Sequence, residues 1–275
     1  MKNIPKSRLL ELSLLVPSPD EQRAISTALV DVDHLIASLE RLIAKKREIK
    51  QGLMQELLTG RTRLSGFTEP WARLKVALES HLKARIGWQG LTTEEYLSSG
   101  SFRLVGGTDL RNGKIDWSTT PFVDKWRFDQ DLNIQLKSGD ILISKDGTIG
   151  KVALVGEMPG PATLNSGVFV VRPKRDAYDS RFLFCMLQSQ LFGDFVAGLS
   201  AGSTINHLYQ KDLATLEFVV PGSLPEQRAI ADIILDADDE IAALGRRLAS
   251  ARAIKQGMMQ ELLTGRTRLT EEVAA

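Results

Sequence analysis

Residues 144–151 combine glycines, a serine and lysines in a pattern that suggests two kinds of catalytic chemistry. The stretch 147–151 could be a phosphate-binding loop, but a P-loop needs four residues between its glycines and Ser or Thr after its lysine. Here two residues separate the glycines and Val152 follows the lysine. Ser144 and Lys145 could act as nucleophile and base, yet adjacent residues of a strand point to opposite faces. Neither pattern supports catalysis.

The residues that bind metals are too few and too scattered to form a site. His34, His81 and His207 lie in different segments and lack ligand spacing. The single cysteine, Cys185, excludes an internal disulfide framework and a cysteine-based zinc site, and its apolar flanks (182–187) indicate a buried core thiol. We therefore expect no metal and no cofactor.

Two further motifs are missing from the sequence. It has no Asn-Pro-Pro-aromatic segment, which an adenine-methylating enzyme would be expected to show, and no nucleotide-hydrolysis motif. The sequence therefore favours binding over catalysis, and we expect a protein that is not an enzyme.

Composition and charge are ordinary for a globular protein. Of 275 residues, 43% are hydrophobic and 25% charged, which is enough apolar material for a core. The net charge of +1 gives no global basic field, so any nucleic-acid surface has to be local. No run reaches the length of a membrane span and no signal peptide is evident. We expect a cytoplasmic protein without a membrane partner.

The elements that position these residues are organised around an internal repeat. Residues 21–25 recur at 226–230, and residues 49–64 recur at 254–269, both at an offset of 205 residues. Two copies are too few for a solenoid. The repeat instead predicts two long helices that flank one inserted domain.

Each copy carries a heptad seam of apolar residues. Lysines interrupt the seam towards its C-terminal end in both copies, with Ile49 and Ile254 beside them, which we interpret as a local stutter. A lone stripe of this kind indicates core packing or homodimerisation, but two copies in one chain most simply pack on each other, antiparallel. The predicted seam consists of Ile25, Leu29, Val32, Ile36, Leu39, Ile43, Leu53, Leu57, Ile230, Ile234, Ile241, Leu244, Leu248, Met258 and Leu262.

Start and stop signals bound both helices. Pro19 and Pro225 stand at the entries, and Gly60 and Gly265 suit left-handed C-terminal caps. Each helix is then about 38 residues, or roughly 57 Å, long. The predicted organisation is a tail segment (1–19), a first long helix (20–60), an inserted domain (61–221), a second long helix (222–265) and a C-terminal tail (266–275).

The insert alternates strand and turn signals without a long heptad. Asn112 and Gly113 form a turn dipeptide, and residues 181–195 indicate a helix. Strands are predicted at 102–105, 141–144, 151–155 and 167–171. The predicted fold class is α+β, with one mixed α/β domain carried by two long antiparallel coiled-coil helices.

The first residues of the chain resemble the end of the insert. Segment 4–17 matches segment 208–221 at an offset of 204 residues. We expect that the chain begins with the closing segment of a domain whose body is absent, although short apolar runs that end in proline can also match by chance.

Residues 53–64 and their second copy closely resemble the conserved-region helices of type I restriction-modification specificity subunits. The insert resembles the target recognition domain of the same family, and the likeness covers essentially the whole chain. The matching pieces of the insert are 107–113, 139–150, 164–167 and 202–208.

The resemblance implies a role. In the family, a recognition domain reads one half of a split DNA site. The helices space the half-sites and dock the modification subunits, which methylate adenine, while motor and nuclease belong to a separate restriction subunit. A full specificity subunit alternates two recognition domains with two helices. This chain departs from that pattern with one complete recognition domain, as in a half-type or N-terminally shortened form. A second copy of the chain or another polypeptide could supply the other half.

A DNA-reading domain of this kind needs polar side chains at base edges and cations at phosphates, usually on loops of a rigid scaffold. Arg85→Ala and Lys145→Ala are expected to weaken DNA binding by the assembled enzyme. A turn inserted or deleted within 30–48 is expected to change the gap between half-sites. The candidate DNA contacts are Lys83, Arg85, Trp88, Gln89, Arg103, Thr108, Arg111, Lys145, Thr148, Lys151, Ser203, Thr204, Asn206 and His207.

The sequence also allows an alternative function. A decayed or truncated gene product could keep the helical pair as a scaffold that only assembles partner proteins and binds no DNA. Absence of DNA binding in the presence of the modification subunit would favour it. The target sequence cannot be read from these residues, because loop conformation decides which side chains reach which bases.

Overall fold

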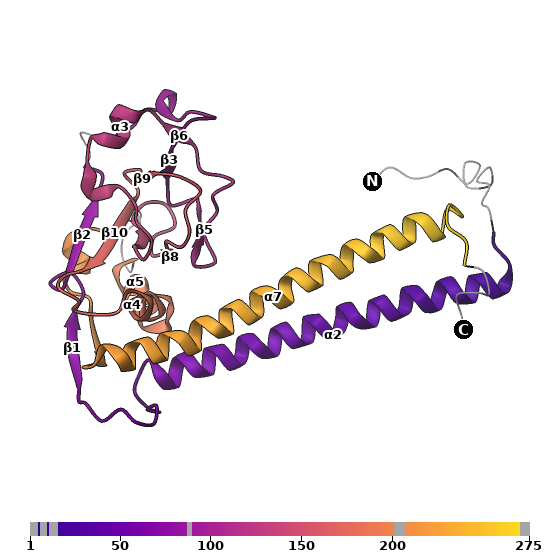
Figure 1. The fold of residues 1–275 in the computed structure, drawn as a ribbon, viewed down its shortest axis with the longest axis horizontal. Coiled ribbons are helices and arrows are strands. Elements are labelled where there is room, and N and C mark those ends of the chain that lie inside the picture. Colours follow the sequence, from indigo (N-terminus) through magenta and orange to yellow (C-terminus); the bar gives the residue numbers. More distant parts are fainter. Residues whose placement is uncertain (1–4, 6–9, 11–15, 87–89, 201–206, 270–275) are drawn as a thin grey trace. The chain divides into compact units, whose positions relative to one another are not determined.

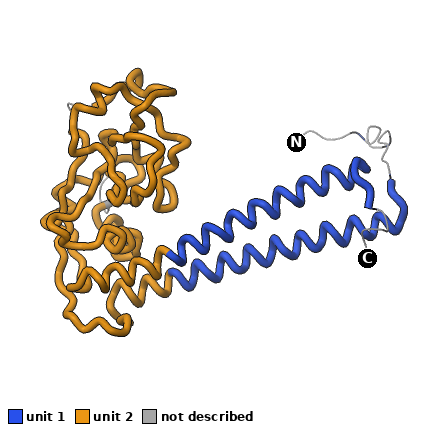
Figure 2. Tube along the Cα trace, in the orientation of Figure 1, with its two compact units in different colours: residues 1–50, 236–275 blue, residues 51–235 orange. Residues whose placement is uncertain are grey.

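The structure, a computed structural model, describes residues 5, 10, 16–86, 90–200 and 207–269 (Figure 1). It divides into two compact units (Figure 2). Unit 1 consists of residues 1–50 and 236–275, and unit 2 of residues 51–235. Both long helices pass from one unit into the other.

Unit 1 is a pair of antiparallel helices. Helix α2 (Pro19–Leu57) and helix α7 (Leu224–Leu262) have 39 residues each. Ion pairs join Glu40 to Arg252 and Asp33 to Lys255, so residue numbers rise along one helix as they fall along the other. The core between them consists of Leu39, Ile43, Leu244 and Ala251, with Ile36, Ile241 and Leu248 packed against it. The predicted antiparallel coiled coil is confirmed.

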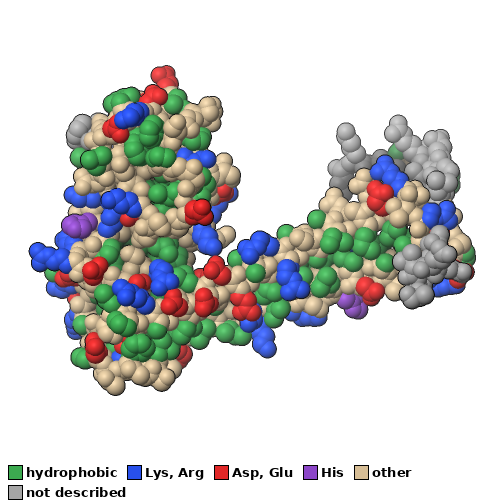
Figure 3. All heavy atoms as spheres, viewed as in Figure 1, with side chains coloured by type: hydrophobic (Ala, Val, Ile, Leu, Met, Phe, Trp, Pro, Cys, Tyr) green, Lys and Arg blue, Asp and Glu red, His purple; other side chains and the backbone are tan. Residues whose placement is uncertain are grey.

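The lysines in the seam face the opposite helix. Lys50 lies 2.6 Å from Asp238, and Lys255 lies 2.6 Å from Asp33. Ile49 and Ile254, which we expected to replace them in the seam, are 46% and 58% exposed, so that interpretation was wrong. The side chains of these lysines are long enough to lie along the interface and reach a carboxylate on the other helix. Acidic and basic side chains are interspersed along the paired helices (Figure 3).

All predicted seam residues are buried or half-buried, and they are divided between the two units. Leu53, Leu57, Ile230 and Ile234 belong to the core of unit 2, where the ends of the helices pack against the inserted domain. The remaining seam residues lie in the segments of α2 and α7 that form unit 1.

The described residues of unit 2 form four sheets built from short strands. A two-stranded antiparallel sheet pairs β1 (Trp71–Lys75) with β11 (Glu217–Pro221). The central antiparallel sheet has the order β2 (Ser80–Ala84), β10 (Val168–Pro173), β7 (Ile141–Ser144) and β8 (Val152–Leu154). A third sheet has the order β6 (Phe122–Val123), β3 (Phe102–Val105) and β9 (Ala162–Leu164), with β3 and β9 parallel. Strands β4 (Leu110–Arg111) and β5 (Lys114–Ile115) form a hairpin.

Helices fill the connections of unit 2. These are η2 (Thr93–Glu95), α3 (Lys125–Asp129), η3 (Leu132–Ile134), α4 (Ser180–Gln188), α5 (Gln190–Ser200) and α6 (Gln210–Leu213).

Both faces of the central sheet are covered, which explains its uninterrupted apolar strands. Successive side chains of a strand point to opposite faces. In β7, Ile141 and Ile143 belong to the core that contains α4, whereas Leu142 belongs to a second core shared with β9. All four residues of β7 are therefore buried.

The turn and helix predictions for the insert hold with one difference. Asn112 (φ 50°) and Gly113 (φ 77°) both take positive φ, as a tight hairpin turn between β4 and β5 requires. The helix expected at 181–195 is two helices, because Ser189 is extended (ψ 166°) and ends α4. Its hydroxyl donates a hydrogen bond to the carbonyl of Met186 at 2.6 Å.

Cys185 is buried in the core formed with α4, as expected. Most of segment 1–17, including the stretch that resembles β11, lies outside the described residues. Within the described part of the chain, no single helix is long and apolar enough to cross a membrane; α4 and α5 together meet that test only as a pair bent by 58°.

Candidate nucleic-acid interface

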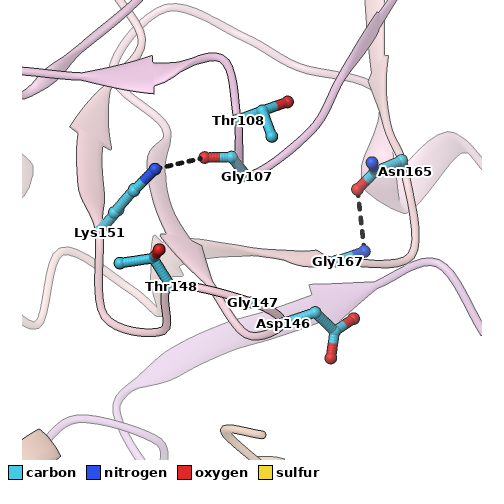
Figure 4. Close-up of a pocket in the computed structure, with 8 residues that line it drawn as sticks. All are labelled: Gly107, Thr108, Asp146, Gly147, Thr148, Lys151, Asn165 and Gly167. Carbon is cyan, nitrogen blue, oxygen red and sulfur yellow. Dashed lines mark hydrogen bonds between the residues drawn. The ribbon is translucent and has the colours of Figure 1, made fainter. Parts of the chain in front are cut away.

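Three loops of unit 2 converge on one pocket. The loop between β3 and β4, the loop between β7 and β8, and the turn between β9 and β10 each contribute residues to it. The lining consists of Gly107, Thr108, Asp146, Gly147, Thr148, Lys151, Asn165 and Gly167 (Figure 4). Since the loops follow three strands of two different sheets (β3, β7 and β9), the scaffold fixes the loop ends while leaving the tips open to a ligand.

Side chains within the loops hold their backbones in place. Asp109 accepts hydrogen bonds from the backbone N–H of Gly106 at 2.8 Å and from the hydroxyl of Thr119 at 2.9 Å. Ser144 donates to the carbonyl of Thr148 at 2.7 Å and accepts from the N–H of Lys151 at 2.8 Å. These bonds close the loop that carries Thr148 and Lys151 in one conformation.

Glycine is required at two points of this framework. Gly147 has φ +68°, which side-chain-bearing residues rarely adopt. A Cβ at Gly106 would stand 2.6 Å from Nδ2 of Asn165, whose Oδ1 accepts from the N–H of Gly167 at 2.8 Å. Close approach between two loops therefore depends on the missing side chain at position 106.

The pocket carries both signs of charge. Nζ of Lys151 lies 3.5 Å from the carbonyl oxygen of Gly107 (Figure 4). Lys145 lies over the ring of Phe169, 5.4 Å from its centroid. Nδ1 of His207 contacts Oδ1 of Asp146. Cationic donors, hydroxyls and the acceptor-only carboxylate of Asp146 thus lie within one small area. This composition is suited to hydrogen-bonding a polar, charged ligand.

Four of the predicted DNA contacts therefore meet at this pocket or beside it, and a fifth joins them through Asp146. They are Thr108, Lys145, Thr148, Lys151 and His207.

A family model described as "Type I restriction modification DNA specificity domain" matches residues 99–250. The chain belongs to this family. The specificity subunit of the MjaVIII type I restriction enzyme from Methanocaldococcus jannaschii is 24% identical over 280 residues, covering 97% of this chain and 65% of that protein. A putative MjaX type I specificity subunit of the same organism is also 24% identical, covering 97% and 62%.

Solved structures of the family share the fold. The S subunit of a type I restriction-modification system from M. genitalium matches with a TM-score of 0.66 at 20% identity, covering 95% of this chain and 66% of that chain. The HsdS subunit of Thermoanaerobacter tengcongensis matches with a TM-score of 0.53 at 21% identity, covering 91% and 60%. The chain spans somewhat less than two thirds of the length of the curated relatives it matches.

Arg85, one of the predicted DNA contacts, is buried inside the domain. Its side chain is 1% exposed, and Nε donates to the carbonyl of Leu164 at 2.8 Å. Its guanidinium also donates to the amide oxygen of Gln130 at 3.1 Å. Burial lowers the pKa of Arg85. A guanidinium enclosed in this way joins loops inside the domain, and its burial argues against the predicted contact with DNA.

Other predicted contacts lie away from the pocket. Arg103 is half-buried and donates at 2.8 Å to the carbonyl of Trp117 and to Thr120, which gives it a structural role. Lys83 is exposed on β2, and Arg111 is exposed on the β4–β5 hairpin, where it pairs with Asp116 at 3.1 Å. The remaining candidates lie outside the described residues: Trp88, Gln89, Ser203, Thr204 and Asn206.

Besides three glycines, two residues that line the pocket, Asp146 and Asn165, were not among the predicted contacts. Both lie in segments that carry the family resemblance, 139–150 and 164–167, but neither was predicted as a DNA contact. Their loops are far apart in sequence, so only pairing of β3 with β9 and of β7 with β10 brings them together. Within the described ranges, no group of three or more His, Cys, Asp or Glu residues could hold a metal ion.

Proposed function

We propose that this chain is a DNA sequence-specificity subunit of a type I restriction-modification complex, and that its recognition domain reads one half of a bipartite site. The convergence of Thr108, Thr148 and Lys151 on one pocket carries the proposal. Hydroxyls and an ammonium on fixed loops can contact phosphates and base edges of double-stranded DNA. Membership of the family supports the same function.

The helical pair serves as spacer and docking element in this proposal. It holds recognition domains at a set separation and binds the modification subunits, which methylate adenine, and the restriction subunits, which supply motor and nuclease. The chain itself is non-catalytic and needs no cofactor. One solved relative, matched with a TM-score of 0.56, comes from work on complex assembly of the type I R-M system, which fits a role in assembly.

A single recognition domain reads only half of such a site. We propose that a second recognition domain, from a second copy of this chain or from elsewhere in the complex, reads the other half. The alternative, a helical scaffold that assembles proteins without DNA, predicts that the pocket residues have no effect on DNA affinity.

The test is DNA binding by the chain assembled with its modification subunit. Lys151→Ala should weaken binding and reduce the slope of log affinity against log salt by about 0.9, as expected for one lost phosphate contact. Lys137→Ala is the control, because Lys137 is a lysine of unit 2 that lies outside the pocket and is exposed, whereas Lys151 is half-buried. Equal affinity of wild type and Lys151→Ala across salt concentrations would contradict the proposed interface. No binding by the wild-type complex would favour the scaffold.

A further inference from the structure

We propose that Asp146 determines specificity by accepting a hydrogen bond from the exocyclic amino group of a cytosine or adenine, and that His207 positions it. The inference rests on the proposed function and names the class of base edge that the pocket reads.

The carboxylate of Asp146 lies at the pocket and is open to a ligand. Its side chain is 45% exposed. Oδ1 is held by Nδ1 of His207. A Cβ at Gly167 would stand 3.5 Å from Oδ2, so the glycine leaves the approach to that oxygen uncovered.

An anion here is informative because most protein contacts to DNA are made to phosphates. A carboxylate repels phosphate, so Asp146 would weaken binding unless it met a donor. Donors in the major groove are the amino groups N4 of cytosine and N6 of adenine, whereas guanine N7 and O6 and thymine O4 are acceptors. Facing a base pair, an ionised aspartate therefore favours two bases and disfavours the others.

The neighbouring groups cannot discriminate in this way. Thr108 and Thr148 carry hydroxyls that donate or accept, and Lys151 only donates. The amide oxygen of Asn165 is already bonded to the N–H of Gly167. Among the described residues that line the pocket, Asp146 is the one whose side chain only accepts.

His207 restrains the rotation of this carboxylate. Its ring lies 4.3 Å from the ring of Tyr209, centroid to centroid, and its backbone forms a bridge with Asp146. The imidazole thus links the β7–β8 loop to the segment before α6. We assign His207 as a positioning residue, since it acts on the base through Asp146.

The test is the adenine-methylation motif produced by the full chain co-expressed with its modification subunit, read by sequencing the host genome. Asp146→Ala should lower discrimination at one position of the motif by about 5- to 50-fold. Asp146→Asn, which has the same size but can donate, should move the preference at that position towards a base with an acceptor. Both readouts are ratios between sites, so they do not depend on the amount of folded protein.

His207 is tested in the same cells. His207→Ala should lower discrimination at the position that Asp146 controls, and His207→Asn, whose amide can donate from near the place of Nδ1, should restore part of it. Asp124→Asn is the matched control, an exposed carboxylate of unit 2 outside the pocket, and should leave the motif unchanged.

Two results would overturn the inference in distinguishable ways. If wild type methylates a defined motif and the Asp146 variants keep every base preference, Asp146 is only a loop link and the proposed function stands. If wild type directs no methylation at all, the proposed function fails and the inference falls with it.

Discussion

At the scale of single residues, hydrogen bonds inside the domain separate the cations that hold it together from those that can meet a ligand. Arg85 is almost completely buried, and Arg172 is bonded to Asp140 at 2.6 Å and to the carbonyl of Gln135 at 2.7 Å. Lys151 and Thr148, in contrast, lie on a loop that lines the pocket. Substitutions at the two kinds of residue should therefore change different observables.

Arg85→Ala should destabilise the recognition domain. Truncation removes the donor that the buried carbonyl of Leu164 uses, which costs about 1–3 kcal/mol. The free energy of unfolding, measured with urea, checks this, with Lys151→Ala as a control of near wild-type stability. If Arg85→Ala instead kept wild-type stability and bound DNA more weakly, the result would support the predicted contact between Arg85 and DNA.

The ion pair between Glu95 and Arg127 should make stability depend on pH. Hydrogen bonds from Arg127, with a further one from the N–H of Thr92, lower the pKa of Glu95 from 4.5 to about 2. A carboxyl whose pKa falls on folding stabilises the protein above its unfolded pKa and loses that contribution as pH falls through the folded pKa.

The advantage of wild type over Glu95→Gln should accordingly be full above pH 4.5 and shrink towards pH 2. Unfolding free energies of the two proteins across that range, with Glu94→Gln as a control, test this. If the difference in unfolding free energy between wild type and Glu95→Gln stayed constant with pH, the stabilisation by Glu95 would not come from its charge.

The pocket shows what sequence reasoning can reach at this scale. Thr108, Thr148 and Lys151 were predicted because they flank glycine turns, and turns carry binding residues. The burial of Arg85 was not predicted, because nothing in its neighbours distinguishes a surface arginine from one that bonds Leu164 across the domain. Asp146 was missed as a contact, because its importance comes from residues distant in the chain.

At the scale of elements, the repeat forms two equivalent clamps. Arg63, which follows α2, binds Glu226 at the start of α7 with distances of 3.0 Å and 2.6 Å. Arg268, which follows α7, binds Glu21 at the start of α2 with distances of 2.7 Å and 2.5 Å. The hydrogen bond from Arg268 lowers the pKa of Glu21. Each helix entry is thus closed by the segment that follows the other helix.

Removing each arginine should loosen a different unit. Arg63→Ala leaves Glu226, which is fully buried, without its cation in unit 2, whereas Arg268→Ala does the same to Glu21 in unit 1. Because an unpaired buried carboxylate is strongly unfavourable, both variants should lose thermal stability, and Arg63→Ala more so.

Hydrogen exchange resolved by peptide is the measurement for the clamps. Arg63→Ala should raise exchange near residues 217–234, and Arg268→Ala near residues 21–40. Arg61→Ala is a control, since Arg61 is exposed and lies beside the first clamp without belonging to it. Identical exchange maps for the two clamp variants would argue against separate clamps.

The elements themselves were largely predictable because their signals are local. The two helices follow from heptads and glycine caps, and Gly60 and Gly265 take φ of +70° and +71° as expected. The role of the seam lysines was not predictable from one helix, since it depends on Asp238 and Asp33 of the opposite helix. The break between α4 and α5 at Ser189 was not predicted, because the apolar pattern continues across it.

At the scale of the whole molecule, one chain carries both the proposed DNA-reading domain and the proposed helical spacer. The seam repeats every seven residues, so seven residues inserted into both helices keep every seam residue facing the other helix. Insertions after Ala44 in α2 and after Gly245 in α7 meet this condition, because both positions are exposed and lie near the same level of the antiparallel pair.

Such a matched insertion should lengthen the spacer by about 10 Å at 1.5 Å per residue. That length corresponds to roughly three base pairs of DNA. The gap between the half-sites in the methylation motif is the measurement, and the half-site sequences should not change. A folded protein with the original gap would show that the helices do not set the spacing.

The central claim is that this chain directs DNA recognition through one half-site reader. The most direct measurement is the adenine-methylation motif of a host genome in which the wild-type chain is co-expressed with its modification subunit, compared with the modification subunit alone. We predict a split motif that depends on the chain. An interrupted palindrome would mean two copies of the chain per complex, and an asymmetric split site would mean a different partner domain. Methylation that is absent, or unchanged without the chain, would contradict the account.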